Sequence, residues 1–70
     1  MKKKIKIKLN GKSKAINSNS TLFNIFQKNK IPLAKVAIEL NQEIVDKKKI
    51  KNINIKNNDK IEIVHFIGGG

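Results

Sequence analysis

The chain has 70 residues, a length that suits one small domain with a single compact core. It contains no cysteine, which excludes disulfide bonds, thiolate nucleophiles and cysteine-ligated zinc. The formal net charge is +11, but all sixteen basic residues are lysines and the only aromatic residues are three phenylalanines. Nucleic-acid recognition usually relies on arginine forks and stacking aromatics. We therefore attribute the lysine excess, which accompanies abundant Asn and Ile, to AT-rich coding and expect no nucleic-acid partner.

No segment is apolar over the ~18 residues that a membrane-spanning helix requires. The opening Met-Lys-Lys-Lys leads into an alternating pattern and not into the apolar core of a signal peptide. We therefore expect a soluble, cytoplasmic protein with no membrane partner. Neither a repeat nor a linker divides the chain. We predict a single domain over residues 1–67 and a flexible glycine tail over residues 68–70.

The N-terminal segment predicts a β-hairpin. Residues 4–9 read Lys-Ile-Lys-Ile-Lys-Leu, and this alternation places the apolar side chains on one face of a strand and the lysines on the other. Asn10 and Gly11 follow, and this pair tolerates the positive φ angles of a type I′ turn. A second strand is expected over residues 12–17.

A helix is expected next, after a polar cluster that supplies several good N-caps. Leu22, Ile25 and Phe26 follow the cluster at the i, i+3 and i+4 spacing of a helical stripe. The pattern predicts a helix over residues 21–30 that packs on the apolar face of the first strand, with Phe26 as a large anchor. Pro32 marks the end of this helix.

The second half of the chain predicts three further strands and a loop. Residues 36–40 alternate as a third strand, and a turn at 41–42 leads into a short fourth strand at 43–45. Residues 46–58 are rich in Lys and Asn, so we expect a loop with one short turn of helix or strand. Residues 60–67 form the most strongly strand-forming run in the chain.

This order of elements predicts an α+β roll in which one helix crosses one face of a mixed sheet of four to five strands. We expect the first and last strands to lie side by side in the middle of the sheet, with their apolar faces under the helix. Ile61 and Ile63 would then join the core. Val64 and Phe66 have the opposite parity, so they would lie on the uncovered face, where large apolar side chains need an explanation.

The side chains offer no convincing active site. The single histidine, His65, lies in the last predicted strand among apolar neighbours, where a structural or surface role is the default. The five acidic residues show no spacing typical of metal or glycosidase sites. We therefore predict a carrier or binding module with no metal site, and not an enzyme.

The sequence ends in Gly68, Gly69 and Gly70, directly after the last predicted strand. A tail without Cβ atoms is slim enough to thread a narrow channel in another protein, and three residues reach at most ~10 Å. The group that such a tail would deliver is the α-carboxylate of Gly70. From the glycines alone, a frayed end is the alternative interpretation.

Residues 59–70 read Asp-Lys-Ile-Glu-Ile-Val-His-Phe-Ile-Gly-Gly-Gly, an acidic turn followed by a strand and a glycine ending. Together with Leu-Asn-Gly-Lys at 9–12 and Val-Ala-Ile-Glu-Leu-Asn at 36–41, this pattern resembles the ThiS family over essentially the whole chain. These proteins are sulfur carriers of thiamine biosynthesis with a β-grasp, ubiquitin-like fold. Two features depart from the family: Asn-Asn at 57–58 replaces the usual Gly-Asp, and the segment near Ile50 lacks an aromatic residue.

The resemblance implies that a ThiF-like adenylating enzyme, which consumes ATP and magnesium, converts the Gly70 carboxylate to an acyl-adenylate. A persulfide donor then leaves a thiocarboxylate on Gly70, and a ThiG-like thiazole synthase takes the sulfur for the thiazole ring of thiamine. The chain itself would bind no cofactor. Val64, Phe66 and Ile67 would form part of the docking patch for both partners.

Three alternatives stay open at this point. The small subunit of molybdopterin synthase has the same fold and also carries a thiocarboxylate, although it is typically longer and the ending at residues 65–70 fits the thiamine carrier better. A ubiquitin-like modifier would form isopeptide bonds with lysines. A basic nucleic-acid-binding module is the least favoured.

Overall fold

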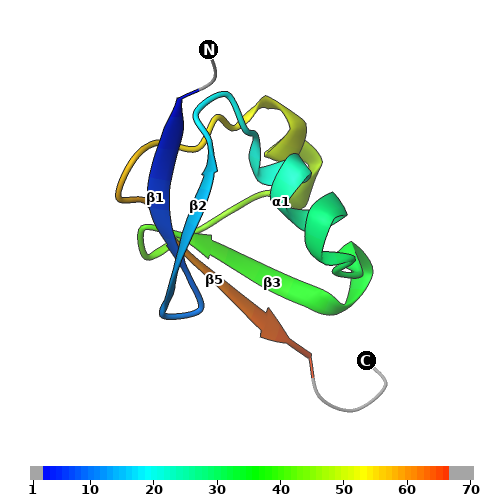
Figure 1. The fold of residues 1–70 in the computed structure, drawn as a ribbon. Helices are drawn as coiled ribbons and strands as arrows, with labels where there is room; N and C mark the ends of the chain where they lie inside the picture. Colours follow the sequence, from blue (N-terminus) through cyan, green and yellow to red (C-terminus); the bar gives the residue numbers. More distant parts are fainter. Residues whose placement is uncertain (1–2, 67–70) are drawn as a thin grey trace.

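The computed structural model describes residues 3–66 as a mixed five-stranded sheet with one α-helix across one face (Figure 1). The expected boundary between domain and tail, after Ile67, lies outside the described residues. Within residues 3–66, no helix is long and apolar enough to cross a membrane. The elements in chain order are β1 (Lys4–Leu9), β2 (Lys12–Asn17), α1 (Leu22–Asn29), η1 (Leu33–Lys35), β3 (Val36–Leu40), β4 (Glu43–Ile44), η2 (Lys47–Asn52) and β5 (Lys60–His65).

The order of the strands across the sheet is β2-β1-β5-β3-β4. β1 and β5 are parallel neighbours, whereas β1–β2, β3–β5 and β3–β4 are antiparallel. The expectation that the first and last strands lie side by side is confirmed, and β5 occupies the centre of the sheet. β1 pairs with β5 only near its start, and β3 pairs with it as far as His65, so β3 holds the end of the strand.

The first hairpin has the predicted register and turn. Leu9 pairs with Lys12, and Asn10 and Gly11 have φ angles of 50° and 83°. These positive values are those of a type I′ turn, which matches the twist of the two strands. Asn10 has a second role that the turn motif does not reveal: its Oδ1 accepts a hydrogen bond of 2.7 Å from the Ile63 N–H of β5.

The helix is confirmed, and its two predicted end residues are its caps. The Thr21 hydroxyl accepts a hydrogen bond of 3.2 Å from the Asn24 N–H, and the Asn24 side chain accepts one of 2.8 Å from the Thr21 N–H. This is a capping box with Asn in the position where Glu or Gln is usual. Lys30 ends the helix in the left-handed conformation, at a φ of 55°. The stripe of Leu22, Ile25 and Phe26 is buried, as predicted.

The core lies between α1 and the covered face of the sheet. Ile61 and Ile63 are 1% and 7% exposed, which confirms the predicted parity of the last strand. Within residues 3–66 the core contains no buried polar side chain. Its buried members are Ile7, Leu9, Leu22, Ile25, Phe26, Val36, Ile38, Ile50, Ile55, Ile61 and Ile63.

The segment at residues 46–58 was expected to be a loop with one short turn, and it contains the 3₁₀ turn η2. Asp46 caps this turn by accepting a hydrogen bond from the Lys48 N–H. Ile50 and Ile55 are each 2% exposed and belong to the core, which the sequence pattern did not predict. The segment therefore contributes two side chains to the core, one from the 3₁₀ helix η2 and one from the stretch that follows it.

Candidate docking surface at the end of the last strand

Val64 and Phe66 lie on the face of the sheet opposite to the helix, as predicted from their parity. They are 56% and 58% exposed, which is unusual for side chains of this size. The other predicted site residues, Ile67, Gly68, Gly69 and Gly70, lie outside the described residues. The structure therefore defines the surface beside the tail and the point at which the chain leaves the sheet.

The sheet holds the chain up to that point. Val64 pairs with Ala37 of the antiparallel strand β3, and His65 pairs with Val36. One step further, the Phe66 N–H donates a hydrogen bond of 2.9 Å to the Lys35 carbonyl. The backbone of Phe66 is therefore attached to the start of β3, although β5 itself ends at His65.

Ile44 is a third large apolar side chain on the same face, and it is 81% exposed. It pairs with Glu39, which pairs with Glu62, so all three residues share the face that carries Val64. We did not predict this position. The signal was available, because a two-residue turn at 41–42, with φ angles of 52° and 72°, fixes the register of β4 against β3.

Glu39 and Glu62 form a cross-strand pair of like charges beside this apolar surface. Directly opposite carboxylates repel one another, which makes the pairing unfavourable for the free protein. Val64 lies two residues beyond Glu62 on the same strand face, and Ala37 lies two residues before Glu39. The uncovered face near the end of β5 thus combines exposed apolar side chains with two carboxylates that face one another across the strands.

Lys47 contacts this surface from the start of η2. Its Nζ donates hydrogen bonds of 2.9 Å to the carbonyls of Leu33 and Val36, and it lies 5.6 Å from the centroid of the Phe66 ring. This distance is within the range of a cation–π interaction. Sequence reasoning treated the lysines as a solvated group and missed this residue, because its partners are main-chain atoms that have no sequence signature.

The other titratable groups of residues 3–66 offer no catalytic constellation. His65 is exposed, which fits the surface alternative of its predicted structural or surface role. Within residues 3–66, no group of three His, Cys, Asp or Glu side chains is arranged to hold a metal ion. Glu39 and Glu62, the two carboxylates on the uncovered face, come from different strands and have no histidine beside them in the strand register.

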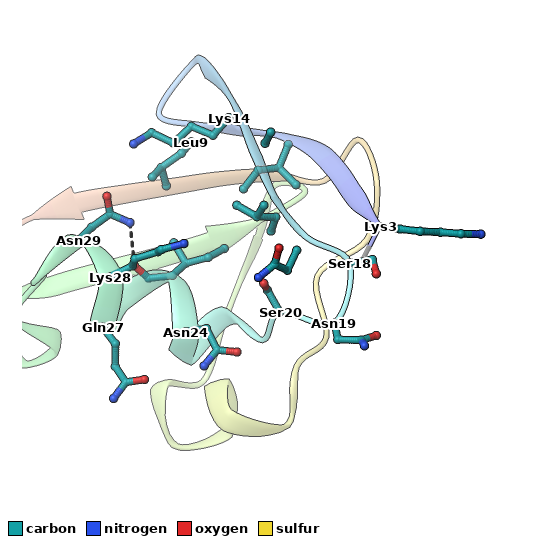
Figure 2. A pocket seen from close by; sticks show the side chains of 15 residues that line it. Lys3, Leu9, Lys14, Ser18, Asn19, Ser20, Asn24, Gln27, Lys28 and Asn29 are labelled. Carbon is teal, nitrogen blue, oxygen red and sulfur yellow. Dashed lines mark hydrogen bonds between the residues drawn. The ribbon is translucent and has the colours of Figure 1, made fainter. Parts of the chain in front are cut away.

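A cleft of about 890 Å³ lies between the β1–β2 hairpin and α1 (Figure 2). All of its lining residues fall between Lys3 and Asn29, so β5 does not border it. Lysine, carboxamide, hydroxyl and aliphatic groups line it, and Asn29 donates a hydrogen bond of 2.7 Å to the Ile25 carbonyl. Because no carboxylate or imidazole is among these groups, the cleft contains no acid–base pair.

One helix across a mixed sheet, with the first and last strands as parallel central neighbours, is the β-grasp arrangement of ubiquitin-like proteins. A crystal structure of the thiamine biosynthesis protein ThiS from Geobacter metallireducens has the same arrangement, with a TM-score of 0.81 and 25% sequence identity. The match covers 94% of this chain and 100% of that one. The predicted fold class is therefore confirmed.

The ThiS family model matches residues 7–70. The sulfur carrier protein ThiS of Bacillus subtilis is 34% identical over 65 residues, which are 91% of this chain and 98% of that protein. Thiazole synthases of Paramagnetospirillum magneticum and Magnetococcus marinus are each 35% identical over 66 residues, and the chain spans 20% of their length. The chain belongs to the ThiS family.

Proposed function

We propose that this chain carries sulfur for the formation of the thiamine thiazole ring, as a thiocarboxylate on Gly70. The observation that carries the proposal is the exposed apolar surface at the end of β5, directly before the predicted tail in the sequence. The family match extends through residue 70, and the residues just before the tail stand on an exposed apolar surface at the end of the central strand. Such a surface supports docking on an enzyme that works on the residues beyond it.

The chemistry follows from the weakness of a carboxylate as an acyl donor, since an oxide ion cannot leave. In the first step the Gly70 carboxylate attacks the α-phosphorus of ATP, which gives an acyl-adenylate and releases pyrophosphate. The terminal sulfur of a protein persulfide then attacks the acyl carbon, AMP leaves, and an acyl disulfide forms. A thiol finally attacks the outer sulfur of that disulfide, so that a new disulfide leaves and the thiocarboxylate stays on Gly70.

Every catalytic group in this cycle belongs to a partner. A ThiF-like adenylating enzyme would bind ATP and magnesium, a persulfide protein would donate sulfur, and a ThiG-like thiazole synthase would accept it. The match to a part of two thiazole synthases supports the last partner, because a carrier-like segment within the same polypeptide indicates that the two functions are used together. The demand for ATP supports a cytoplasmic location.

Val64 and Phe66 would form the core of the docking patch, together with Ile67 and with Ile44 at its edge. Large side chains that stay exposed in the free protein contribute little to its folding stability, but they bury apolar surface when a partner binds. The carboxylates of Glu39 and Glu62 beside them favour a partner surface that places a cation opposite the pair. Burial of the apolar groups would supply most of the affinity, and the charges would orient the complex.

The test is a transfer experiment with labelled sulfur. The chain is loaded with ATP, the adenylating enzyme and a sulfur-labelled persulfide donor, purified, and mixed with thiazole synthase and its other substrates. We expect the label to pass into the thiazole product. Label that stays on the loaded chain would contradict the thiazole role, and a ladder of conjugates to lysine side chains would indicate a protein modifier instead.

A further inference from the structure

We propose that Lys47 is a positioning residue that holds Phe66, and with it the start of the glycine tail, in the geometry needed for loading. The inference rests on the proposed function, because it concerns the delivery of the Gly70 carboxylate. Lys47 differs from the other lysines of residues 3–66 in that its ammonium donates hydrogen bonds to the main chain.

The first contact of Lys47 continues the ladder along the outer edge of β3. Val45 N–H donates a hydrogen bond of 2.9 Å to the Ile38 carbonyl, beyond the last paired residue of β4. Carbonyls that face one edge of a strand recur every second residue, so the next one toward the start of β3 is that of Val36. The chain has turned away into η2 at this point, and the Lys47 ammonium donates to Val36 in place of a backbone N–H.

The second contact joins the same ammonium to the turn before β3. The Leu33 carbonyl of η1 accepts a hydrogen bond of 2.9 Å from Lys47 Nζ. An ammonium has three donors, and two of them are used here on neighbouring carbonyls. Lys47 therefore fixes η1 and the first residue of β3 relative to one another.

The third contact reaches Phe66, whose ring centroid lies 5.6 Å from Lys47 Nζ. The backbone of Phe66 is already bound to Lys35, which lies between the two residues whose carbonyls Lys47 holds. Ring and backbone of Phe66 are thus attached to one small unit. Without the ammonium, the ring would lose the contact that sets its direction, and the Lys35 carbonyl that accepts from the Phe66 N–H would lie in a segment no longer braced by Lys47.

This restraint has a chemical purpose at the root of the tail. Three glycines are flexible but reach at most ~10 Å, so the place where the tail starts limits where the Gly70 carboxylate can lie. Adenylation requires the Gly70 carboxylate at near-attack distance from the α-phosphorus of ATP, and small misplacements of reacting groups are costly in rate. Phe66 is the last residue before the tail within residues 3–66, and Lys47 contacts its ring.

The experiment compares three variants in the ATP–pyrophosphate exchange catalysed by the adenylating enzyme. In Lys47→Met the alkyl chain is kept and the charge is lost, and we expect kcat to fall about tenfold, less than the hundredfold that an ångström of misplacement can cause. The KM for the carrier chain should change by less than about threefold, because the exposed apolar side chains of the docking patch are still present. Lys47→Arg keeps a cation that can donate to both carbonyls and stack on the ring, and it should restore kcat to within about twofold.

Lys51→Met is the matched control. Its Nζ lies 4.9 Å from the ring centroid of Phe23 on α1, so this variant also loses one charge and one cation–π contact, but at Phe23 and not at Phe66. We expect its kcat and KM to equal those of the wild type. A kcat for Lys47→Met equal to that of Lys51→Met would overturn the positioning role.

A second readout does not depend on the enzyme. Hydrogen exchange of the Phe66 amide should accelerate in Lys47→Met relative to the Ile63 amide in the core of β5, and it should stay unchanged in Lys51→Met. An unchanged hydrogen-exchange rate of the Phe66 amide in Lys47→Met would overturn the inference, whatever the enzyme kinetics show. If the wild type supports no ATP–pyrophosphate exchange, the proposed adenylation is contradicted. The hydrogen-exchange rates of the Phe66 amide would still decide whether Lys47 holds Phe66.

Discussion

Glu39 of β3 and Glu62 of β5 lie directly opposite one another on the uncovered face of the sheet. Like charges in this position reduce stability, so either Glu39→Gln or Glu62→Gln should raise the free energy of unfolding by about 0.2–1 kcal/mol. The appropriate measurement is urea titration at ~0.15 M salt, because the long-range interactions of the two glutamates with the many lysines are then screened.

The two substitutions should not be additive. Once one carboxylate is neutral, the second change removes no further repulsion, so the double variant should be only as stable as the better single variant. Glu43→Gln serves as a control, because Glu43 pairs with Leu40 and has no carboxylate opposite. Fully additive gains, or an equal gain in the control, would mean that the pair does not repel measurably.

Phe66→Ala should weaken binding to the adenylating enzyme and to thiazole synthase by about 2 kcal/mol or more if the side chain is a hot spot of the docking patch. Val64→Ala should have a smaller effect of the same sign. Calorimetric titration would measure both. Stability should fall little, because the two side chains are more than half exposed in the free protein.

Phe23→Ala is the control for this comparison. Phe23 also lies under a lysine ammonium, but it is on α1, and its loss should leave partner affinity unchanged. If Phe66→Ala binds both partners as tightly as the wild type while the fold stays intact, the docking patch hypothesis is wrong.

Asn10→Gly separates the two roles of Asn10. Glycine adopts the positive φ of the turn without strain, but it removes the acceptor of the Ile63 N–H. Leaving this part-buried donor unpaired should cost about 1–3 kcal/mol in the free energy of unfolding. If chemical denaturation shows no loss, water replaces the side chain and the bond between hairpin and β5 has no net value.

Ile55→Val tests whether the irregular segment after β4 is part of the core. Removing one methylene from a buried isoleucine costs about 0.5–1.5 kcal/mol, and Ile55 is 2% exposed. Ile44→Val removes the same group from a side chain that is 81% exposed and should cost almost nothing. Equal stabilities of the two variants would show that the segment does not pack as described.

The regular part of this fold could be predicted from the sequence because its signals are local. Each of these signals depends on residues that are close together in the sequence: the alternation in residues 4–9 and 36–40, the Asn-Gly turn, and the helical stripe around Phe26. The exposure of Val64 and Phe66 followed from parity once the neighbouring isoleucines were assigned to the core.

The features that were missed depend on contacts between distant segments. Ile55 is buried because the Leu22 N–H donates to the Ile53 carbonyl and the Ile55 N–H to the Ser20 carbonyl, which bind the irregular segment to the start of the helix. Lys47 is one of three consecutive lysines, and nothing in the sequence shows that its ammonium finds two carbonyls and a ring. Main-chain acceptors are common to all residues, so tertiary structure alone selects among them.

The chemistry of the tail predicts that its length is fixed. A variant with one alanine added after Gly70 should fold with unchanged stability but fail to load, because the carboxylate would be displaced by up to ~3.6 Å from the reacting phosphorus. Mass spectrometry of the intact protein after incubation with ATP and the enzymes would measure the loaded fraction. Loading of the extended chain at the wild-type rate would show that the enzyme does not select the position of the last residue.

The central claim is that sulfur resides on the carboxyl group of Gly70. Tandem mass spectrometry of the C-terminal peptide, released after incubation with ATP, the adenylating enzyme and a persulfide donor, locates the modification to a single residue. The account predicts that one oxygen of Gly70 is replaced by sulfur and that every lysine is unchanged. Sulfur or a conjugate on any other residue, with an unmodified Gly70, would contradict it.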